Sequence, residues 1–196
     1  MAQVILIRPG STDYDAEGRI QGNLDIPLSD RGQTEVHELV EQLRGLPLEA
    51  LYSAASGPSL ETAEAIGSAL SLRVSRLKEL ENVDHGLWQG LKVDEVRRKH
   101  PRVFRQWEET PENICPPEGE TLAEAYARMD KVLRPLLARQ KHRTIGIVAS
   151  EPLASVIRCY LKESSLGEIW KDAQDEEKWE LLEVATKPRE KVAKQA

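Results

Sequence analysis

Cysteine, long apolar runs and positive charge are all in short supply in this chain. Its two cysteines, Cys115 and Cys159, fit neither a disulfide framework nor a metal-ligand spacing, so we expect two free thiols. No apolar run approaches the roughly 20 residues of a membrane-spanning helix. No basic leader precedes the first strand-like run, Val4 to Ile7. The sequence therefore predicts a cytoplasmic protein with no membrane partner.

The charge balance narrows the possible partners further. Lysine and arginine number 27 against 33 aspartate and glutamate residues, which gives a formal net charge of −6. A chain with this balance has no general attraction for nucleic acid or anionic membranes, so we expect neither as a partner. The length of 196 residues, 40% of them apolar, is enough for one core. We predict a single domain over residues 1–184 and a disordered tail over 185–196, which has no apolar period.

Short apolar runs alternate with helical patterns along the chain. The predicted strands are residues 3–7, 50–53, 72–77, 144–149 and 178–184. The predicted helices are residues 29–45, 58–70, 121–140 and a segment after Ser150. Residues 93–117 are charged and interrupted by prolines, and we expect two short helices and a loop that form a lid over one end of the sheet. This alternation predicts an α/β fold, a three-layer α/β/α sandwich with a mainly parallel sheet.

Several polar turns follow the predicted strands. Ligands of open α/β sheets bind beyond the carboxyl ends of the strands. The turns after Ile7, Ser53, Leu77 and Ala149 should therefore meet at one pocket.

Six polar or glycine-containing segments follow one another along the chain: residues 8–12, 18–22, 25–29, 62–66, 86–90 and 119–121. In order and spacing they resemble the histidine phosphatase family, the phosphoglycerate mutase-like phosphatases. The likeness extends over residues 3–160 and implies the fold of that family. It also implies chemistry by a histidine nucleophile, a second histidine, two arginines that hold phosphate and an acidic proton donor.

Four of the positions that the resemblance assigns to this chemistry hold other residues. Pro9 stands where the nucleophilic histidine is expected, and Pro58 stands in place of the second arginine. Asn82 replaces the acid, and Ser150 replaces the second histidine. Arg8 alone of the reacting set matches the pattern. We therefore predict a catalytically inactive protein, a pseudoenzyme with a binding or regulatory role. The alternative is a phosphate-ester hydrolase or mutase that works through a rearranged site.

Seven residues are predicted to line the pocket: Arg8, Gly10, Ser11, Asp15, Gln21, His85 and Glu151. We expect no cofactor and no metal in it. Residues 13–18 are similar to the first half of a calcium loop, but the position for its closing glutamate holds Leu24. The expected partner is a small anionic molecule or another protein, and the sequence does not indicate the oligomeric state.

Two residues of this region allow a second interpretation. His85 could replace the missing nucleophile, although a structural or surface histidine is the simpler interpretation. Ser150 follows a strand as serine-hydrolase nucleophiles do, but the flanking glycines of that motif are missing, so we expect a helix N-cap. Trp107 in the lid is the tryptophan most suited to contact a ligand.

Overall fold

The computed structural model describes residues 2–140, 142–166 and 177–184. Within these residues one sheet contains the strands β1 Ala2–Ile7, β2 Leu48–Ser53, β3 Val74–Arg76, β4 Thr144–Val148 and β5 Trp179–Val184. The strand order is β3-β2-β4-β1-β5. All neighbours pair in parallel except β5, which is antiparallel to β1 at the edge of the sheet. The predicted mainly parallel sheet is confirmed.

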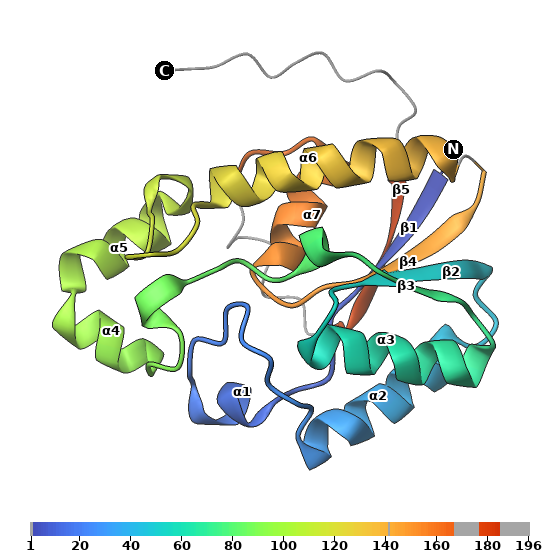
Figure 1. Cartoon of the computed structure of the whole chain (residues 1–196), viewed down its shortest axis with the longest axis horizontal. Coiled ribbons are helices and arrows are strands. Elements are labelled where there is room, and N and C mark those ends of the chain that lie inside the picture. The colour runs from blue at the N-terminus through green and yellow to red at the C-terminus, as the bar shows by residue number, and fades with distance from the viewer. Residues whose placement is uncertain (1, 141, 167–176, 185–196) are drawn as a thin grey trace.

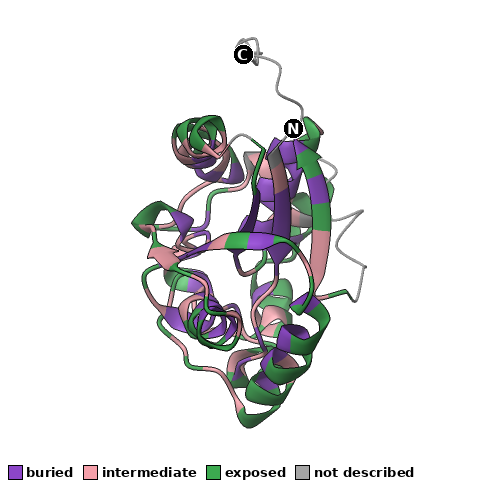
Figure 2. Ribbon diagram, turned by 90° about the vertical axis from the view of Figure 1, so that its right-hand side faces the viewer, coloured by how far each residue is buried: buried purple, intermediate pink, exposed green. Residues whose placement is uncertain are grey.

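Helices cover both faces of this sheet. They are α2 Asp30–Leu43, α3 Gly57–Leu70, α6 Leu122–Arg139 and α7 Leu153–Lys162. Successive residues of a strand point to opposite faces. Ile5 and Ile7 of β1 accordingly pack with α2 and α3, whereas Val4 and Leu6 pack with α6 and α7. Figure 1 shows the three layers, and Figure 2 shows that burial is concentrated on the strands and on the helix sides that face them. The predicted α/β/α sandwich is confirmed.

Local sequence signals explain where the covering helices begin. The Ser29 side chain accepts a hydrogen bond from the Gly32 N–H and caps α2, as predicted. Thr121 and Glu124 form a capping box at the start of α6. Pro58 lies in the first turn of α3, where its missing N–H costs no helical hydrogen bond.

The lid segment has a small core of its own. It contains α4 Val93–Lys99, α5 Pro101–Glu109 and a 3₁₀ turn, Pro111–Asn113. Val96 and Phe104 of these helices pack against Ile20 of a preceding loop and Trp88 of a preceding 3₁₀ turn. The lid helices lie apart from the four covering helices, on the left in Figure 1. The two predicted short helices are therefore present.

The structure also contains elements that the sequence patterns missed. They are α1 Asp13–Glu17 and the 3₁₀ turns Lys78–Leu80 and Gly86–Trp88. Strand β3 is shorter than the predicted 72–77. Helix α1 has no buried residue, so the sequence has no apolar periodicity that would predict it. The predicted tail, residues 185–196, lies outside the described residues.

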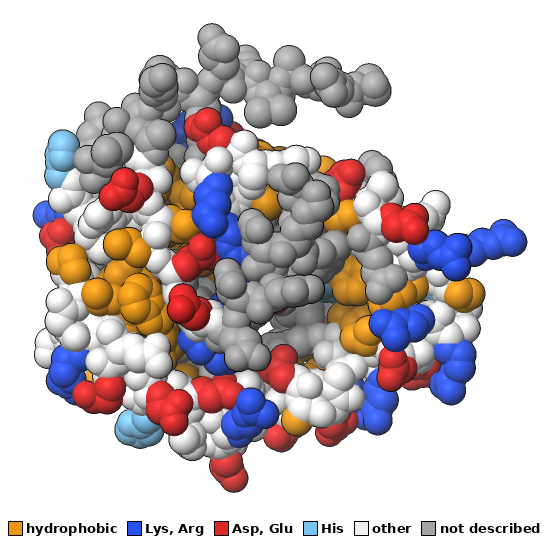
Figure 3. Space-filling model, turned by 180° about the vertical axis from the view of Figure 1, so that it is seen from behind, with side chains coloured by type: hydrophobic (Ala, Val, Ile, Leu, Met, Phe, Trp, Pro, Cys, Tyr) orange, Lys and Arg blue, Asp and Glu red, His pale blue; other side chains and the backbone are white. Residues whose placement is uncertain are grey.

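The surface shows no segregation of charge on the face seen from behind. Figure 3 shows acidic and basic side chains interspersed over that face. No helix of the described residues is long and apolar enough to cross a lipid bilayer.

Candidate functional site

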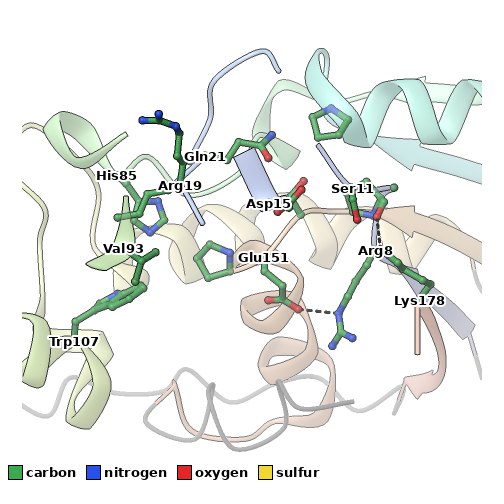
Figure 4. Close-up of a pocket in the computed structure, with 17 residues that line it drawn as sticks. Arg8, Ser11, Asp15, Arg19, Gln21, His85, Val93, Trp107, Glu151 and Lys178 are labelled. Atoms are coloured by element: carbon green, nitrogen blue, oxygen red, sulfur yellow. Dashed lines mark hydrogen bonds and ion pairs between the residues drawn. The ribbon is translucent and has the colours of Figure 1, made fainter. Parts of the chain in front are cut away.

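A cavity of about 380 Å³ opens at the carboxyl ends of β1 and β4. All seven predicted lining residues border it: Arg8, Gly10, Ser11, Asp15, Gln21, His85 and Glu151. Three of the four substituted positions, Pro9, Pro58 and Ser150, border it too. The lining also includes residues that the sequence did not single out for it, among them Arg19, Val93 and Lys178. Figure 4 shows how the labelled side chains surround the space.

The turn after β1 has its hydrogen-bond donors occupied by the protein itself. Pro9 has no backbone N–H. The Gly10 N–H donates to Thr62 Oγ1 at 3.1 Å. Both the N–H and the hydroxyl of Ser11 donate to Glu35 Oε2, at 2.9 and 2.7 Å. This turn therefore presents its N–H groups to side chains of α2 and α3, and a ligand has to compete for them.

Glu35 of α2 holds this turn through a charged contact. Its carboxylate also lies 3.0 Å from Lys178 Nζ, and the side chain is 16% exposed. Burial alone raises the pKa of Glu35, but hydrogen bonds from Ser11 and Lys178 outweigh it and lower the pKa to about 2. Glu35 is therefore ionised near neutral pH and joins α2, the β1 turn and the start of β5.

Close backbone packing fixes the same turn against α2. A Cβ atom added at Gly10 would lie 2.4 Å from the Gly32 carbonyl oxygen. One added at Gly32 would lie 2.0 Å from the Ser11 carbonyl oxygen. Side chains at either position would push the turn away from the helix, so the glycines are required by this close approach.

Arg8 is engaged by a carboxylate of the protein. Its Nε donates to Glu151 Oε1 at 2.9 Å, and its Nη1 donates to the Glu177 carbonyl oxygen at 3.0 Å. The second oxygen of Glu151 accepts hydrogen bonds from the N–H and hydroxyl of Ser155, at 3.2 and 2.7 Å. Glu151 thus pairs with Arg8 (Figure 4) and also satisfies the Ser155 N–H in the first turn of α7.

Asn82 lies outside the lining of this cavity, although its position was expected in the same pocket. Its Nδ2 donates to the carbonyl oxygens of Gly22 and Glu151, at 3.1 and 2.8 Å. Its Oδ1 accepts from the Leu153 N–H at 3.2 Å. An ionised carboxylate at this position could not donate either bond. Asn82 therefore connects three segments of the chain by hydrogen bonds.

The N-cap role predicted for Ser150 is wrong. Helix α7 begins at Leu153, its N-cap residue is Pro152, and the helix-capping carboxylate comes from Glu151. The Ser150 hydroxyl instead lies 3.1 Å from the hydroxyl of Ser59 in α3. Glu151 and Pro152 separate Ser150 from the first residue of the helix, and the Ser150 side chain contacts α3 instead.

His85 is a buried histidine at the lid end of the cavity. It is 4% exposed, and burial lowers its pKa, so the ring is neutral near pH 7. Its Nδ1 lies 3.0 Å from the Val83 carbonyl oxygen, which only accepts hydrogen bonds. The proton is therefore assigned to Nδ1, and Nε2 is left as an acceptor. The ring meets Trp107 edge to face, with centroids 6.3 Å apart.

Asp15 and Gln21 both contact Thr12. Asp15 Oδ2 accepts from the Thr12 N–H at 2.6 Å and from its hydroxyl at 2.8 Å. Gln21 Oε1 accepts more weakly from the same hydroxyl at 3.4 Å. Asp15 therefore forms the capping box of α1 with Thr12, the N-cap residue, while it borders the cavity. Among the described residues no three His, Cys, Asp or Glu side chains form a group that could hold a metal ion.

A sequence model of the histidine phosphatase superfamily (branch 1) matches residues 4–194. The chain belongs to the histidine phosphatase superfamily. Phosphoserine phosphatase 1 of Hydrogenobacter thermophilus is 32% identical over 170 residues, which cover 87% of this chain and 81% of that protein. "Probable phosphoglycerate mutase GpmB" of Salmonella arizonae is 29% identical over 133 residues, which cover 68% of this chain and 62% of that protein.

A solved structure has the same fold as this superfamily member. Bacillus stearothermophilus YhfR superposes with a TM-score of 0.80 at 26% identity, over 87% of this chain and 84% of that chain. The family resemblance and the phosphoglycerate mutase-like fold predicted from the sequence are therefore confirmed.

Proposed function

We propose that this histidine phosphatase superfamily member binds a small molecule in the cavity beside Arg8 and transfers no phosphoryl group. The β1 turn is the observation that carries the proposal. Pro9 stands where the family resemblance places the nucleophile, and its ring nitrogen is part of the peptide bond and has no free lone pair. The N–H groups of Gly10 and Ser11 are bonded to Thr62 and Glu35.

The electrostatics of the cavity support the same proposal. Glu151 lies 2.9 Å from Arg8, so a phosphate dianion that approached this guanidinium would also approach a carboxylate. Two like charges about 4 Å apart repel by about 4 kcal/mol at an effective dielectric constant near 20. Tight phosphate binding would require this carboxylate to move away, and its bonds to Ser155 oppose such a movement.

A phosphoprotein assay tests the proposal. The protein is incubated with ³²P-labelled phosphoserine and with labelled bisphosphoglycerate, next to an active superfamily member. We expect no acid-labile phosphoprotein, because the β1 turn holds no histidine. A labelled band at stoichiometric yield, removed by mild acid, would contradict the proposal.

The second candidate is a phosphate-ester hydrolase or mutase with a rearranged site, and the names of the relatives favour it. The matched proteins are named as a phosphatase and a probable mutase. Of the residues that line the cavity, His85 is the one histidine, and its ring nitrogen could act as a nucleophile. Turnover of phosphoserine or phosphoglycerate that disappears in His85→Ala, with folding intact, would establish this second candidate.

A further inference from the structure

The cavity has two chemically different ends. Figure 4 shows His85, Val93 and Trp107 together on one side, and Arg8 and Lys178 on the opposite side. Val93 and Trp107 of the first end belong to the lid and, with the His85 ring, form an aromatic and apolar surface, with Arg19 beside His85. An apolar group placed there would be removed from water by side chains that are already packed on the small core of the lid.

The positive charges that line the cavity are balanced before any ligand arrives. Each of the three cationic side chains in the lining contacts a carboxylate. The pairs are Arg8 with Glu151 at 2.9 Å, Arg19 with Glu17 at 2.5 Å, and Lys178 with Glu35 at 3.0 Å. A dianionic ligand would add two uncompensated negative charges to these pairs, whereas a zwitterion would add no net charge.

Asp15 and Glu151 provide a place for a positive group between the two ends (Figure 4). Asp15 Oδ2 accepts both hydrogen bonds from Thr12, so Oδ1 is the atom that can meet an ammonium group. Arg8 and Lys178, on the far side, are the donors that a carboxylate would meet. The donors and acceptors therefore follow one another in the order carboxylate site, ammonium site, aromatic site.

We propose that the cavity recognises a zwitterion with an aromatic side chain, that is, an aromatic amino acid or a close analogue. This inference rests on the proposed non-catalytic binding function and names its ligand class. The volume of about 380 Å³ lies in the lower part of the range of small-molecule pockets, about 300–1,000 Å³.

Five probes that separate the chemical groups test the ligand class by calorimetry on the full chain. L-phenylalanine carries all three groups, 3-phenylpropionate lacks the ammonium, phenethylamine lacks the carboxylate, glycine lacks the ring, and phenyl phosphate is a dianion. Each charged group makes charge-assisted hydrogen bonds, so we expect L-phenylalanine to bind about tenfold or more tightly than any other probe.

Variants locate the binding site. Trp107→Ala should weaken L-phenylalanine binding while the affinity for glycine stays unchanged. Asp15→Asn keeps an oxygen for Thr12 and removes the charge, so the preference for L-phenylalanine over 3-phenylpropionate should fall about tenfold. Asp13→Asn is the matched control, because Asp13 is exposed on the same short helix and lies outside the lining.

The outcomes separate this inference from the proposed function. Tighter binding of phenyl phosphate than of L-phenylalanine, or no binding of L-phenylalanine at millimolar concentrations, would overturn the ligand class. Equal effects of Asp13→Asn and Asp15→Asn would overturn the assigned ammonium site. These binding measurements do not detect a phosphoprotein. The proposed absence of phosphoryl transfer is therefore tested separately, by the phosphoprotein assay.

Discussion

Replacing Glu35 by glutamine removes the charge that holds the β1 turn in place. The folded protein lowers the pKa of Glu35 from 4.5 to about 2. At 1.36 kcal/mol per pKa unit, this shift corresponds to about 3 kcal/mol of stability from the ionised carboxylate. The side chain is only 16% exposed, so solvent screening of its contact with Lys178 is limited. We therefore expect Glu35→Gln to lower the free energy of unfolding by up to about 3 kcal/mol near neutral pH.

The stabilisation by Glu35 depends on pH, and the direction follows from its lowered pKa. The pKa of Glu35 is lower in the folded chain than in the unfolded chain, so the unfolded chain binds more protons between those two values. The stabilisation is therefore complete above about pH 5 and is lost as the pH falls through about 4.5 towards 2. Urea unfolding of parent and Glu35→Gln should give a stability difference that shrinks over this window.

Glu38→Gln on the same helix is the control, because Glu38 is exposed. It should change the stability by no more than about 0.5 kcal/mol. If the Glu35→Gln difference were the same at neutral pH and near pH 3, the charged contact would not be what holds the turn.

Three further predictions concern other parts of the site. Asn82→Glu removes two donated hydrogen bonds and should lower the free energy of unfolding by about 2 to 4 kcal/mol in urea; a change below about 0.5 kcal/mol would contradict this role. Burial lowers the pKa of His85, so protonation of the unfolded chain should reduce thermal stability as the pH falls below about 6.5, and His85→Gln should flatten that slope. A combined repair variant should gain vanadate affinity, whereas its single changes should gain almost none. The repair consists of Pro9→His, Pro58→Arg, Ser150→His and Glu151→Gly. A folded repair variant that binds vanadate no better than the parent would mean that these positions do not form one phosphate site.

General rules of local structure and topology were sufficient to predict the layers of the fold and the place of the cavity. The alternating strands and helices predicted the layers, and Ser29 predicted the start of α2 because capping is a local property. The convergence of the strand ends placed Arg8 and Glu151 in one cavity, although they lie far apart along the chain.

The contacts within the site depend on distant segments and could not be predicted in this way. The sequence indicates neither that Glu35 meets Lys178 nor that the Ser150 hydroxyl faces Ser59. The sequence indicates Asn82 only as the replacement of an expected acid. The hydrogen bonds of its amide depend on where the fold places Gly22 and residues 151–153. Helix α1 was missed because a capping box, and no apolar face, defines it.

Phosphorus-31 NMR of the protein mixed with phosphoserine at equal concentration tests the central claim most directly. The spectrum reports the ester, any phosphoprotein and free phosphate in one sample. We predict that the ester signal persists and that no phosphate signal grows above a protein-free control. Growth of a phosphate signal in proportion to the protein, and its loss in Arg8→Ala, would contradict the claim that this superfamily member transfers no phosphoryl group.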